Sequence, residues 1–187
     1  LLSFRRNEKI FEELGFSKSA IKKTLRDQGL SYSNGDLSWH YHIFAGWHDL
    51  RLRKSIDVKN ILEIGTHNGS FTKFLSKVFK DSRIFTIDLP QHDWQFVHTY
   101  NRETLQKQQE FLSIRRKNLK GSNIKFIELN SINILKYFKN MKFDAIWVDG
   151  DHHNPQVTID LINCTILVPL PDMRIATASF IQNYQSI

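Results

Sequence analysis

Short apolar runs alternate with helical patterns from Asn60 onward, and this alternation constrains the fold more than any other feature of the chain. Four runs are typical of buried strands: NILEI at 60–64, RIFTID at 83–88, IKFIEL at 124–129 and FDAIWV at 143–148. After the first run, apolar residues recur at helical spacing, namely Phe71, Phe74, Leu75, Val78 and Phe79. Alternating strands and helices predict an α/β fold with a doubly wound, mostly parallel sheet.

The first 55 or so residues carry helical patterns and turn-rich loops instead of strands. Ser17 is placed to cap a helix that runs to about Asp27 and that Gly29 would end. An aromatic-rich helix is expected over residues 39–55, and a further helix near 102–119 would carry Leu105, Leu112 and Leu119 in one stripe. We therefore expect a helical N-terminal extension over residues 1–58 and a Rossmann-like domain over residues 59–187.

Composition and charge exclude some classes of protein and leave others open. With 41% hydrophobic and 24% charged residues among 187, the chain has the composition of a globular domain. It has no apolar run of the roughly 18 residues that a membrane span needs, no signal-peptide pattern at its start, and a single cysteine, Cys164. These features predict a cytoplasmic protein without a membrane partner. The net charge of +7 permits nucleic acid as a partner, but the basic residues are scattered and favour solvated helix faces: Arg5 and Arg6, Lys22 and Lys23, Arg51 to Lys54, and Arg115 to Lys120.

Polar and acidic residues follow each of the four predicted strands. Right-handed crossovers place the C-terminal ends of parallel strands at one edge of the sheet, where ligands of such sheets bind. The groups expected there are Glu63 with Gly65 to Gly69, then Asp88, then Asn130 and Ser131, and finally Asp149, Asp151 and His152. Buried strands rarely finish in carboxylates that have no partner, so the sequence predicts a binding site at this edge.

The glycine spacing after the first strand argues against a dinucleotide site. Gly65 and Gly69 form G-x-x-x-G, whereas a dinucleotide fold uses G-x-G-x-x-G. His67 occupies the middle position. A carboxylate at Glu63 would repel a pyrophosphate, but it suits a ligand that brings hydroxyls or positive charge. A nicotinamide-dependent oxidoreductase is therefore the less favoured alternative.

Asp88 follows Gly65 by 23 residues, at the end of the second predicted strand. A carboxylate there can accept both hydroxyls of a ribose, and each hydrogen bond to a charged group contributes about 1.5–3 kcal/mol. The alternative is a turn or cap residue before Pro90. The glycines and Glu63 nearby favour the ribose.

Three stretches of the sequence carry a resemblance to a known family. ILEIGTHNGSFT, FTIDLP and FDAIWVDGDHH resemble the class I S-adenosylmethionine-dependent methyltransferases, and in particular the branch whose fourth strand ends in D-G-D-H. The resemblance covers about residues 60–164. It implies that S-adenosylmethionine is the cofactor, and that its methionine end lies against Glu63 and the turn formed by Gly65, Thr66, His67, Asn68, Gly69 and Ser70. It further implies that Asp88 binds the ribose, that Asn130 and Ser131 lie near the adenine, and that Asp149 lies beside the methyl group.

The element VDGDHHNP bears on the type of reaction. Methyl transfer to oxygen gains from a general base near the acceptor hydroxyl, and Asp149, Asp151 and His152 are the candidates. Some relatives in the family hold Mg²⁺ through the aspartate that ends the fourth strand, which makes Asp149 a candidate ligand. The acidic pair that would complete such a site is missing, because Asp172 stands alone in LPDMR. The N-P-P-Y-like element of methyltransferases that act on base amines is also missing after the fourth strand.

We thus expect an S-adenosylmethionine-dependent enzyme that methylates an oxygen of a small molecule or sugar. The stretch from 165 to 187 is too short to supply the fifth strand, an acidic loop and the last two strands of the family sheet, although RIATASFI at 174–181 is suited to one strand. The C-terminal part of the sheet is therefore expected to be incomplete. A truncated, non-catalytic module that binds S-adenosylmethionine remains the main alternative.

Overall fold

The structure is a computed structural model that describes residues 2–32, 39–99, 102–168 and 175–177. The chain divides into two compact units. The first contains residues 1–57 and 77–79, and the second contains residues 58–76 and 80–187. The predicted domain boundary after residue 58 stays a prediction.

The described residues of the first unit form the helices α1 (Leu2–Glu13), α2 (Lys18–Asp27) and α3 (Trp39–Arg53). Ser17 caps α2 as expected, because its side chain accepts a hydrogen bond from the backbone N–H of Ala20. Gly29 follows α2 at a φ of +71°, in the left-handed region that glycine favours. Apolar side chains from all three helices are buried in this unit: Phe11, Ile21, Leu25 and Phe44.

The second unit is the predicted α/β sheet. Its strands are β1 (Asn60–Ile64), β2 (Arg83–Asp88), β3 (Ile124–Glu128), β4 (Ala145–Val148) and β5 (Ile175–Thr177). They are all parallel, in the order β3-β2-β1-β4-β5. This order confirms the doubly wound, Rossmann-like prediction, since the chain starts at the centre and builds outward in both directions.

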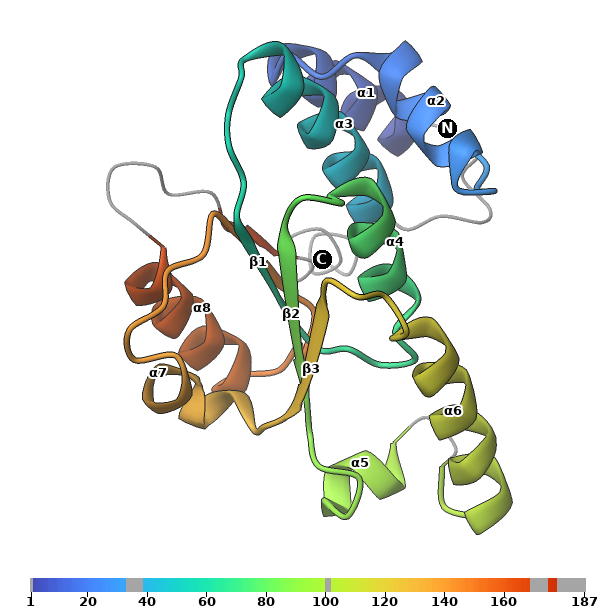
Figure 1. Ribbon diagram of the computed structural model, residues 1–187, viewed down its shortest axis with the longest axis vertical. Helices are drawn as coiled ribbons and strands as arrows, with labels where there is room; N and C mark the ends of the chain where they lie inside the picture. Colours follow the sequence, from blue (N-terminus) through green and yellow to red (C-terminus); the bar gives the residue numbers. More distant parts are fainter. Residues whose placement is uncertain (1, 33–38, 100–101, 169–174, 178–187) are drawn as a thin grey trace. The chain divides into compact units, whose positions relative to one another are not determined.

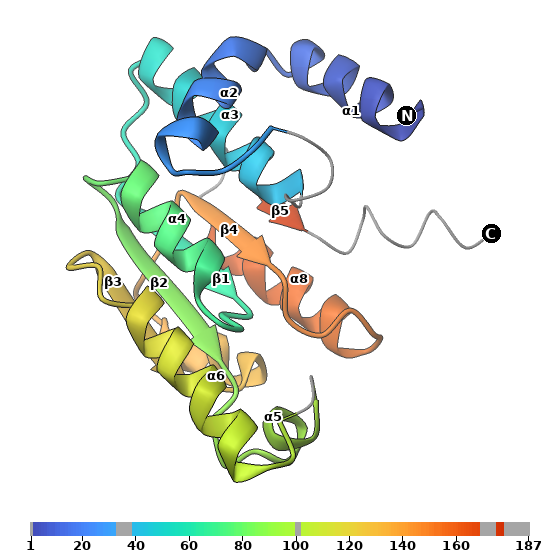
Figure 2. The same ribbon diagram turned by 90° about the vertical axis from the view of Figure 1, so that its right-hand side faces the viewer.

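Helices cover both faces of this sheet (Figures 1 and 2). One face carries α4 (Ser70–Val78) and α6 (Leu105–Asn118), and the other carries α7 (Ile134–Tyr137) and α8 (Gln156–Leu167). The short α5 (Trp94–His98) and the single 3₁₀ turn η1 (Ser131–Asn133) follow the C-terminal ends of β2 and β3. Because both faces are covered, the central strands β1 and β4 are mostly buried, and every residue of β4 is buried and apolar.

The predicted leucine stripe of α6 is only partly right. Leu105 is 77% exposed, and the fully buried residue of this helix is Arg115. The expectation that Arg115 to Lys120 lie on a solvated face is therefore wrong for Arg115. Its guanidinium lies over the rings of Phe96, Phe111 and Phe126, at 4.9, 5.0 and 5.2 Å from their centroids. These aromatic faces allow a cation to replace an apolar residue in the stripe.

Two further details concern the residues after β3 and β4. Asn130 caps the turn after β3, because its Oδ1 accepts a hydrogen bond from the backbone N–H of Ile132 at 3.1 Å. The predicted strand over 174–181 is described for Ile175–Thr177, while Asp172 lies outside the described residues.

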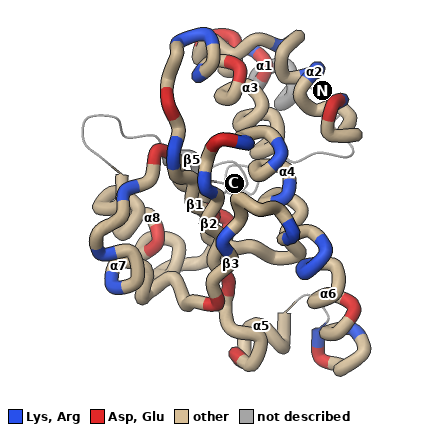
Figure 3. The backbone as a smooth tube through the Cα atoms, viewed as in Figure 1, with Lys and Arg blue, Asp and Glu red and all other residues tan. Residues whose placement is uncertain are grey.

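The basic residues are spread over several elements, including α2, α4, α6 and α7 (Figure 3). Of the helices described, none combines the length and the apolar character that crossing a bilayer requires.

Candidate functional site

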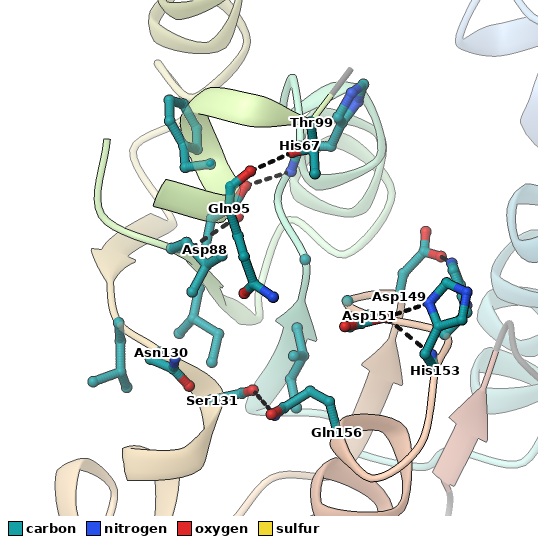
Figure 4. Close-up of a pocket in the computed structure, with 18 of the residues that line it drawn as sticks. His67, Asp88, Gln95, Thr99, Asn130, Ser131, Asp149, Asp151, His153 and Gln156 are labelled. Atoms are coloured by element: carbon teal, nitrogen blue, oxygen red, sulfur yellow. Dashed lines mark hydrogen bonds and ion pairs between the residues drawn. The ribbon is translucent and has the colours of Figure 1, made fainter. Parts of the chain in front are cut away.

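A cavity of about 670 Å³ lies at the C-terminal edge of the sheet (Figure 4). It collects residues that follow β1, β2, β3 and β4, as the topology predicts. Among the predicted site residues, those that line it are Gly65, His67, Asp88, Asn130, Ser131, Asp149, Asp151 and His152. The lining also includes Gln95, Phe96, Thr99, Arg102 and Gln156, which the sequence did not single out. Five predicted residues do not line it: Glu63, Thr66, Asn68, Gly69 and Ser70.

The turn after β1 is fixed between its two neighbouring strands. The backbone N–H of Gly65 donates to the carbonyl of Ile87 at 2.9 Å, and that of Asp149 donates to the carbonyl of Ile64 at 2.8 Å. Gly65 has a φ of +99°, and a Cβ at this position would overlap the carbonyl group of Asp149. Glycine is therefore required at 65, because the loops after β1 and β4 meet there.

The second glycine of the turn serves the start of α4. Gly69 has a φ of +76°, and a Cβ there would come within 3.0 Å of the Leu119 side chain. Asn68 accepts a hydrogen bond from the backbone N–H of Ser70 at 3.0 Å and so satisfies one of the first N–H groups of α4. The G-x-x-x-G spacing thus combines a close approach of two loops with a helix start, and the sequence predicted this turn correctly.

Glu63 lies beneath the turn and not in the cavity. Its side chain is buried, at 2% exposure, and its Oε2 accepts hydrogen bonds from Thr72 Oγ1 at 2.5 Å and Thr86 Oγ1 at 2.6 Å. Thr86 in turn shares a hydrogen bond of 2.6 Å with Thr66. Burial raises the pKa of the Glu63 carboxyl to about 8. Glu63 thus supports the turn from below, and its expected contact with a ligand stays a prediction.

Asp88 lies at the cavity wall, and backbone and side-chain donors hold its carboxylate in place. Oδ2 accepts from the backbone N–H of His67 at 2.9 Å and from Arg115 Nη2 at 3.0 Å, and Oδ1 accepts from the backbone N–H of Leu89 at 2.8 Å. Burial raises the pKa of this carboxyl, while Arg115 and the two backbone donors act to lower it. The sequence predicted the position of Asp88 but not its partner Arg115.

Arg115 contacts two predicted parts of the site, Asp88 and the turn after β1, although it was not itself predicted as a site residue. Besides its bond to Asp88, its Nε donates to the carbonyl of His67 at 2.8 Å, and its side chain is only 3% exposed. Arg102, which lines the cavity, lies over the same rings of Phe96 and Phe111, at 4.1 and 4.6 Å. Burial, followed by the charges of these two arginines, lowers the pKa of the His67 imidazole. In the sequence, Arg115 resembled a charge on a solvated helix face, so no sequence pattern indicated its contacts with Asp88 and His67.

The acidic and histidine residues after β4 form two pairs. His152 Nε2 lies 3.7 Å from Asp149 Oδ1, and both side chains are about one third exposed. His153 Nδ1 lies 2.8 Å from Asp151 Oδ1, which also accepts from the backbone N–H of His153 at 2.9 Å. Partial burial acts to raise the pKa of Asp151, but the hydrogen bonds and charge of His153 lower it. The contact between Asp149 and His152 is thus longer than the contact between Asp151 and His153, and Figure 4 shows the latter pair.

Asn130 and Ser131 line the cavity beside the start of α8, at a distance from Asp88 (Figure 4). Gln156 Nε2 donates to Ser131 Oγ at 2.8 Å and to Asp160 Oδ1 at 2.9 Å. Asp160 itself is 1% exposed. A polar network therefore underlies this end of the cavity, and its α8 members were not predicted.

No group of three or more metal-binding side chains gathers anywhere in the part of the chain that the structure describes. Asp149, the candidate ligand, lies 3.7 Å from His152. A magnesium site at Asp149 stays a hypothesis, since Asp172 falls outside the described residues.

Comparisons with solved structures bear on the fold. In all, 154 chains match. One is a Staphylococcus aureus protein whose name proposes a caffeoyl-CoA O-methyltransferase, with a TM-score of 0.50 and 16% identity over 90% of this chain and 69% of that one. Others are the O-methyltransferase TomG of Streptomyces achromogenes (0.48, 20%, over 86% and 66%) and the fibrillarin/Nop5p complex (0.42, 16%, over 59% and 45%). The chain thus spans between 45% and 69% of these three proteins.

Comparisons with protein families identify the chain more directly. A search of the curated proteins finds no match. The model of a family described as a methyltransferase domain, in contrast, matches residues 62–169, which include the end of β1, the whole of β2, β3 and β4, and every residue that lines the cavity. The finer branch with the D-G-D-H element stays a prediction. Because the match covers more than half of the chain, the chain belongs to the methyltransferase-domain family, and its resemblance to class I S-adenosylmethionine-dependent methyltransferases is confirmed.

Proposed function

We propose that the chain binds S-adenosylmethionine in the cavity at the sheet edge and transfers its methyl group to an oxygen of a small molecule or sugar. The single observation that carries this proposal is the shared cavity. It brings the Gly65 turn, the carboxylate of Asp88 and the Asp149–His152 pair together on a family-matched sheet. Its volume of about 670 Å³ lies within the roughly 300–1,000 Å³ of small-molecule sites.

The residues present suit this cofactor. Gly65 lines the cavity, and the absence of a Cβ there lets the loops after β1 and β4 meet at the cavity wall. Asp88 uses three acceptor positions on protein donors, and an ionised carboxylate has about four. One ribose hydroxyl can therefore bind Asp88 directly, where the sequence had suggested both. The bound cofactor would supply an activated methyl group on a sulfonium.

The chain's own contribution to the reaction would be a base and its orientation. Asp149 lies at the end of β4 with its backbone fixed to β1, so its carboxylate has a defined place at the cavity wall. His152 lies 3.7 Å from it and can hold or receive a proton taken from an acceptor hydroxyl. Asp151 is already bonded to His153 and is less suited to this task. We therefore assign proton removal to the Asp149–His152 pair.

The alternative hypotheses differ from this proposal in turnover, in the cofactor or in the acceptor. A non-catalytic module would use the same cavity and differ only in turnover. The nicotinamide-dependent oxidoreductase receives no support, because the matched family is a methyltransferase domain. Nucleic acid remains the less favoured acceptor, since the basic residues are spread over several elements (Figure 3).

A calorimetric titration with S-adenosylhomocysteine, with NAD as the control ligand, tests the proposal. We expect micromolar binding of the former alone, and a loss of at least several-fold in affinity for Asp88→Ala. If Asp88→Ala bound S-adenosylhomocysteine as tightly as the wild-type chain, the ligand would not contact Asp88. Methyl transfer to a library of hydroxylated small molecules and sugars then distinguishes the enzyme from the binding module, which would bind the cofactor but give no product.

A further inference from the structure

Three residues of the turn after β1 have a left-handed backbone conformation, and one of them is not glycine. Gly65 and Gly69 have φ values of +99° and +76°, and His67 between them has a φ of +48°. A residue with a Cβ adopts this conformation uncommonly, because the Cβ comes too close to the following carbonyl oxygen. Contacts from outside the turn are therefore needed to keep His67 in it.

Other elements bind the backbone of His67 on both sides. Its N–H donates to Asp88 Oδ2 at 2.9 Å (Figure 4). Its carbonyl accepts from Arg115 Nε at 2.8 Å, and Arg115 Nη2 donates to the same oxygen of Asp88 at 3.0 Å. The three residues thus form a closed ring of hydrogen bonds. Because the φ and ψ angles of His67 set the directions of its N–H and carbonyl groups, a rotation out of the left-handed region would break this ring.

The same end of α6 binds the next carbonyl of the turn. Asn118 Nδ2, three residues after Arg115, donates to the carbonyl of Asn68 at 3.0 Å. Leu119 packs on the turn as well, since a Cβ at Gly69 would lie 3.0 Å from its side chain. Residues three and four apart lie on one face of a helix. One face of α6 therefore holds two successive carbonyls of the turn, and we call Arg115 and Asn118 the α6 clasp.

The guanidinium of Arg115 is itself held in one orientation. It is 2% exposed and lies over the rings of Phe96, Phe111 and Phe126. Its Nη1 is buried and, within the part of the chain that the structure describes, has no hydrogen-bond partner, so its hydrogen bonds all go to the site. A lysine there would keep the positive charge near Asp88, but its ammonium is a point charge on a flexible stem and lacks the planar fork.

We propose that Arg115, supported by Asn118, is a positioning residue that keeps the turn over residues 65–69 in the left-handed conformation that receives the cofactor. Gly65 and His67 line the cavity, whereas neither residue of the α6 clasp does. The effect on the ligand is therefore transmitted through the turn. Without the clasp, the turn relaxes, and only the fraction of molecules that keeps the left-handed form binds. This inference rests on the proposed function, because it concerns the same cavity.

This role differs in its consequences from a simple countercharge. If Arg115 served only to neutralise Asp88, Arg115→Lys would bind the cofactor as tightly as the wild-type chain does. If Arg115 holds the turn, Arg115→Lys should weaken binding. His67→Gly should then remove most of that loss, because glycine enters the left-handed region without the Cβ conflict.

The test is a double-mutant cycle, measured by calorimetry with S-adenosylhomocysteine. We expect Arg115→Lys to raise Kd by about tenfold or more in the wild-type background, and by less than about threefold in the His67→Gly background. Arg116→Lys, at the exposed neighbour, is the matched control and should leave Kd unchanged. Asn118→Ala, at a half-buried position, should raise Kd by about threefold or more, and it keeps the test decisive if Arg115→Lys does not fold.

Hydrogen exchange of the turn gives a second readout that needs no ligand. The backbone N–H of Gly69 donates to the carbonyl of Thr66 at 2.8 Å, across the turn. Measured by NMR, the amides of His67 and Gly69 should exchange about tenfold faster or more in Arg115→Lys than in the wild-type chain. Amides at the centre of β1 report the stability of the whole sheet. A merely structural loss of stability would speed up these strand amides and not those of the turn.

The outcomes distinguish this inference from the proposed function. An equal loss of affinity from Arg115→Lys in both backgrounds, or unchanged affinity of a folded Asn118→Ala variant, would overturn the role of the α6 clasp and leave the proposed function intact. Turn amides that exchange at the wild-type rate in Arg115→Lys would also overturn it. Absence of S-adenosylhomocysteine binding to the wild-type chain would overturn the proposed function, and with it the part of the clasp in cofactor binding.

Discussion

Two carboxylates that follow β4 lie in different surroundings, and this difference separates their roles. Asp151 is bonded twice to His153, whereas Asp149 lies at 3.7 Å from His152 and faces the cavity. We predict that Asp149→Asn lowers kcat by about 10²–10⁴-fold, the usual contribution of a general base, and spares cofactor binding. Single-turnover kinetics and calorimetry measure the two effects. Asp151→Asn is the matched control with the smaller loss, and an equal loss in both variants would contradict the assignment.

Glu63 should make the stability of the fold depend on pH. Burial raises its folded-state pKa from 4.5 to about 8, so the folded state binds the proton more tightly than the unfolded state. The stabilisation is fully present below about pH 4.5, and it is lost as the pH rises toward 8, by an amount on the order of a few kcal/mol. Glu63→Gln keeps an acceptor for Thr72 and Thr86 but cannot ionise.

Urea denaturation of the wild-type protein and of the Glu63→Gln variant between pH 5 and 8.5 tests this expectation. The free energy of unfolding of the wild-type chain should fall relative to that of Glu63→Gln as the pH rises. A constant difference between the two chains over this range would mean that the Glu63 carboxyl titrates in the folded state as it does in the unfolded one.

At the scale of elements, α6 contributes a buried cation to the site. Arg115 donates to Asp88 and to the carbonyl of His67, while its neighbour Arg116 is exposed. We predict that Arg115→Met lowers the free energy of unfolding by about 3–5 kcal/mol, because the variant leaves a partly buried carboxylate without its ion pair. Arg116→Met should stay within about 0.5 kcal/mol of the wild type. Urea denaturation at constant pH compares the two, and equal effects would contradict the role of Arg115.

The elements themselves were accessible from sequence, but their polar contacts were not. Short, mostly apolar runs such as NILEI and FDAIWV predicted β1 and β4, because a strand of a parallel sheet that is covered on both faces is apolar on both sides. The Gly65–Gly69 turn was predictable because backbone conformation restricts the residue type. Arg115 and Asp160 resemble ordinary helix charges in sequence, since their burial depends on which residues face them across the fold. Glu63 was placed at the correct strand end, but its burial there and its absence from the cavity lining were not predicted.

At the scale of the whole molecule, the cavity belongs to one of the two compact units. All residues that line it fall within 58–76 and 80–187. The elements that carry it are far apart in sequence, so cofactor binding is coupled to the folding of the entire sheet. The sequence predicted a doubly wound, mostly parallel sheet without a strand order, and the run RIATASFI at 174–181, named as suited to one strand, contains β5.

This coupling gives a prediction for the sheet as a whole. A ligand that binds only the folded unit, at 100 times its Kd, stabilises that unit by about 2.7 kcal/mol. Amide hydrogens in the centre of β1 and β2, which exchange only when the sheet opens, should then exchange about 100-fold more slowly with S-adenosylhomocysteine. NAD at the same concentration is the control and should leave exchange unchanged. If calorimetry shows binding while these amides exchange at the same rate, the ligand does not depend on the intact sheet edge, and the cavity is not its site.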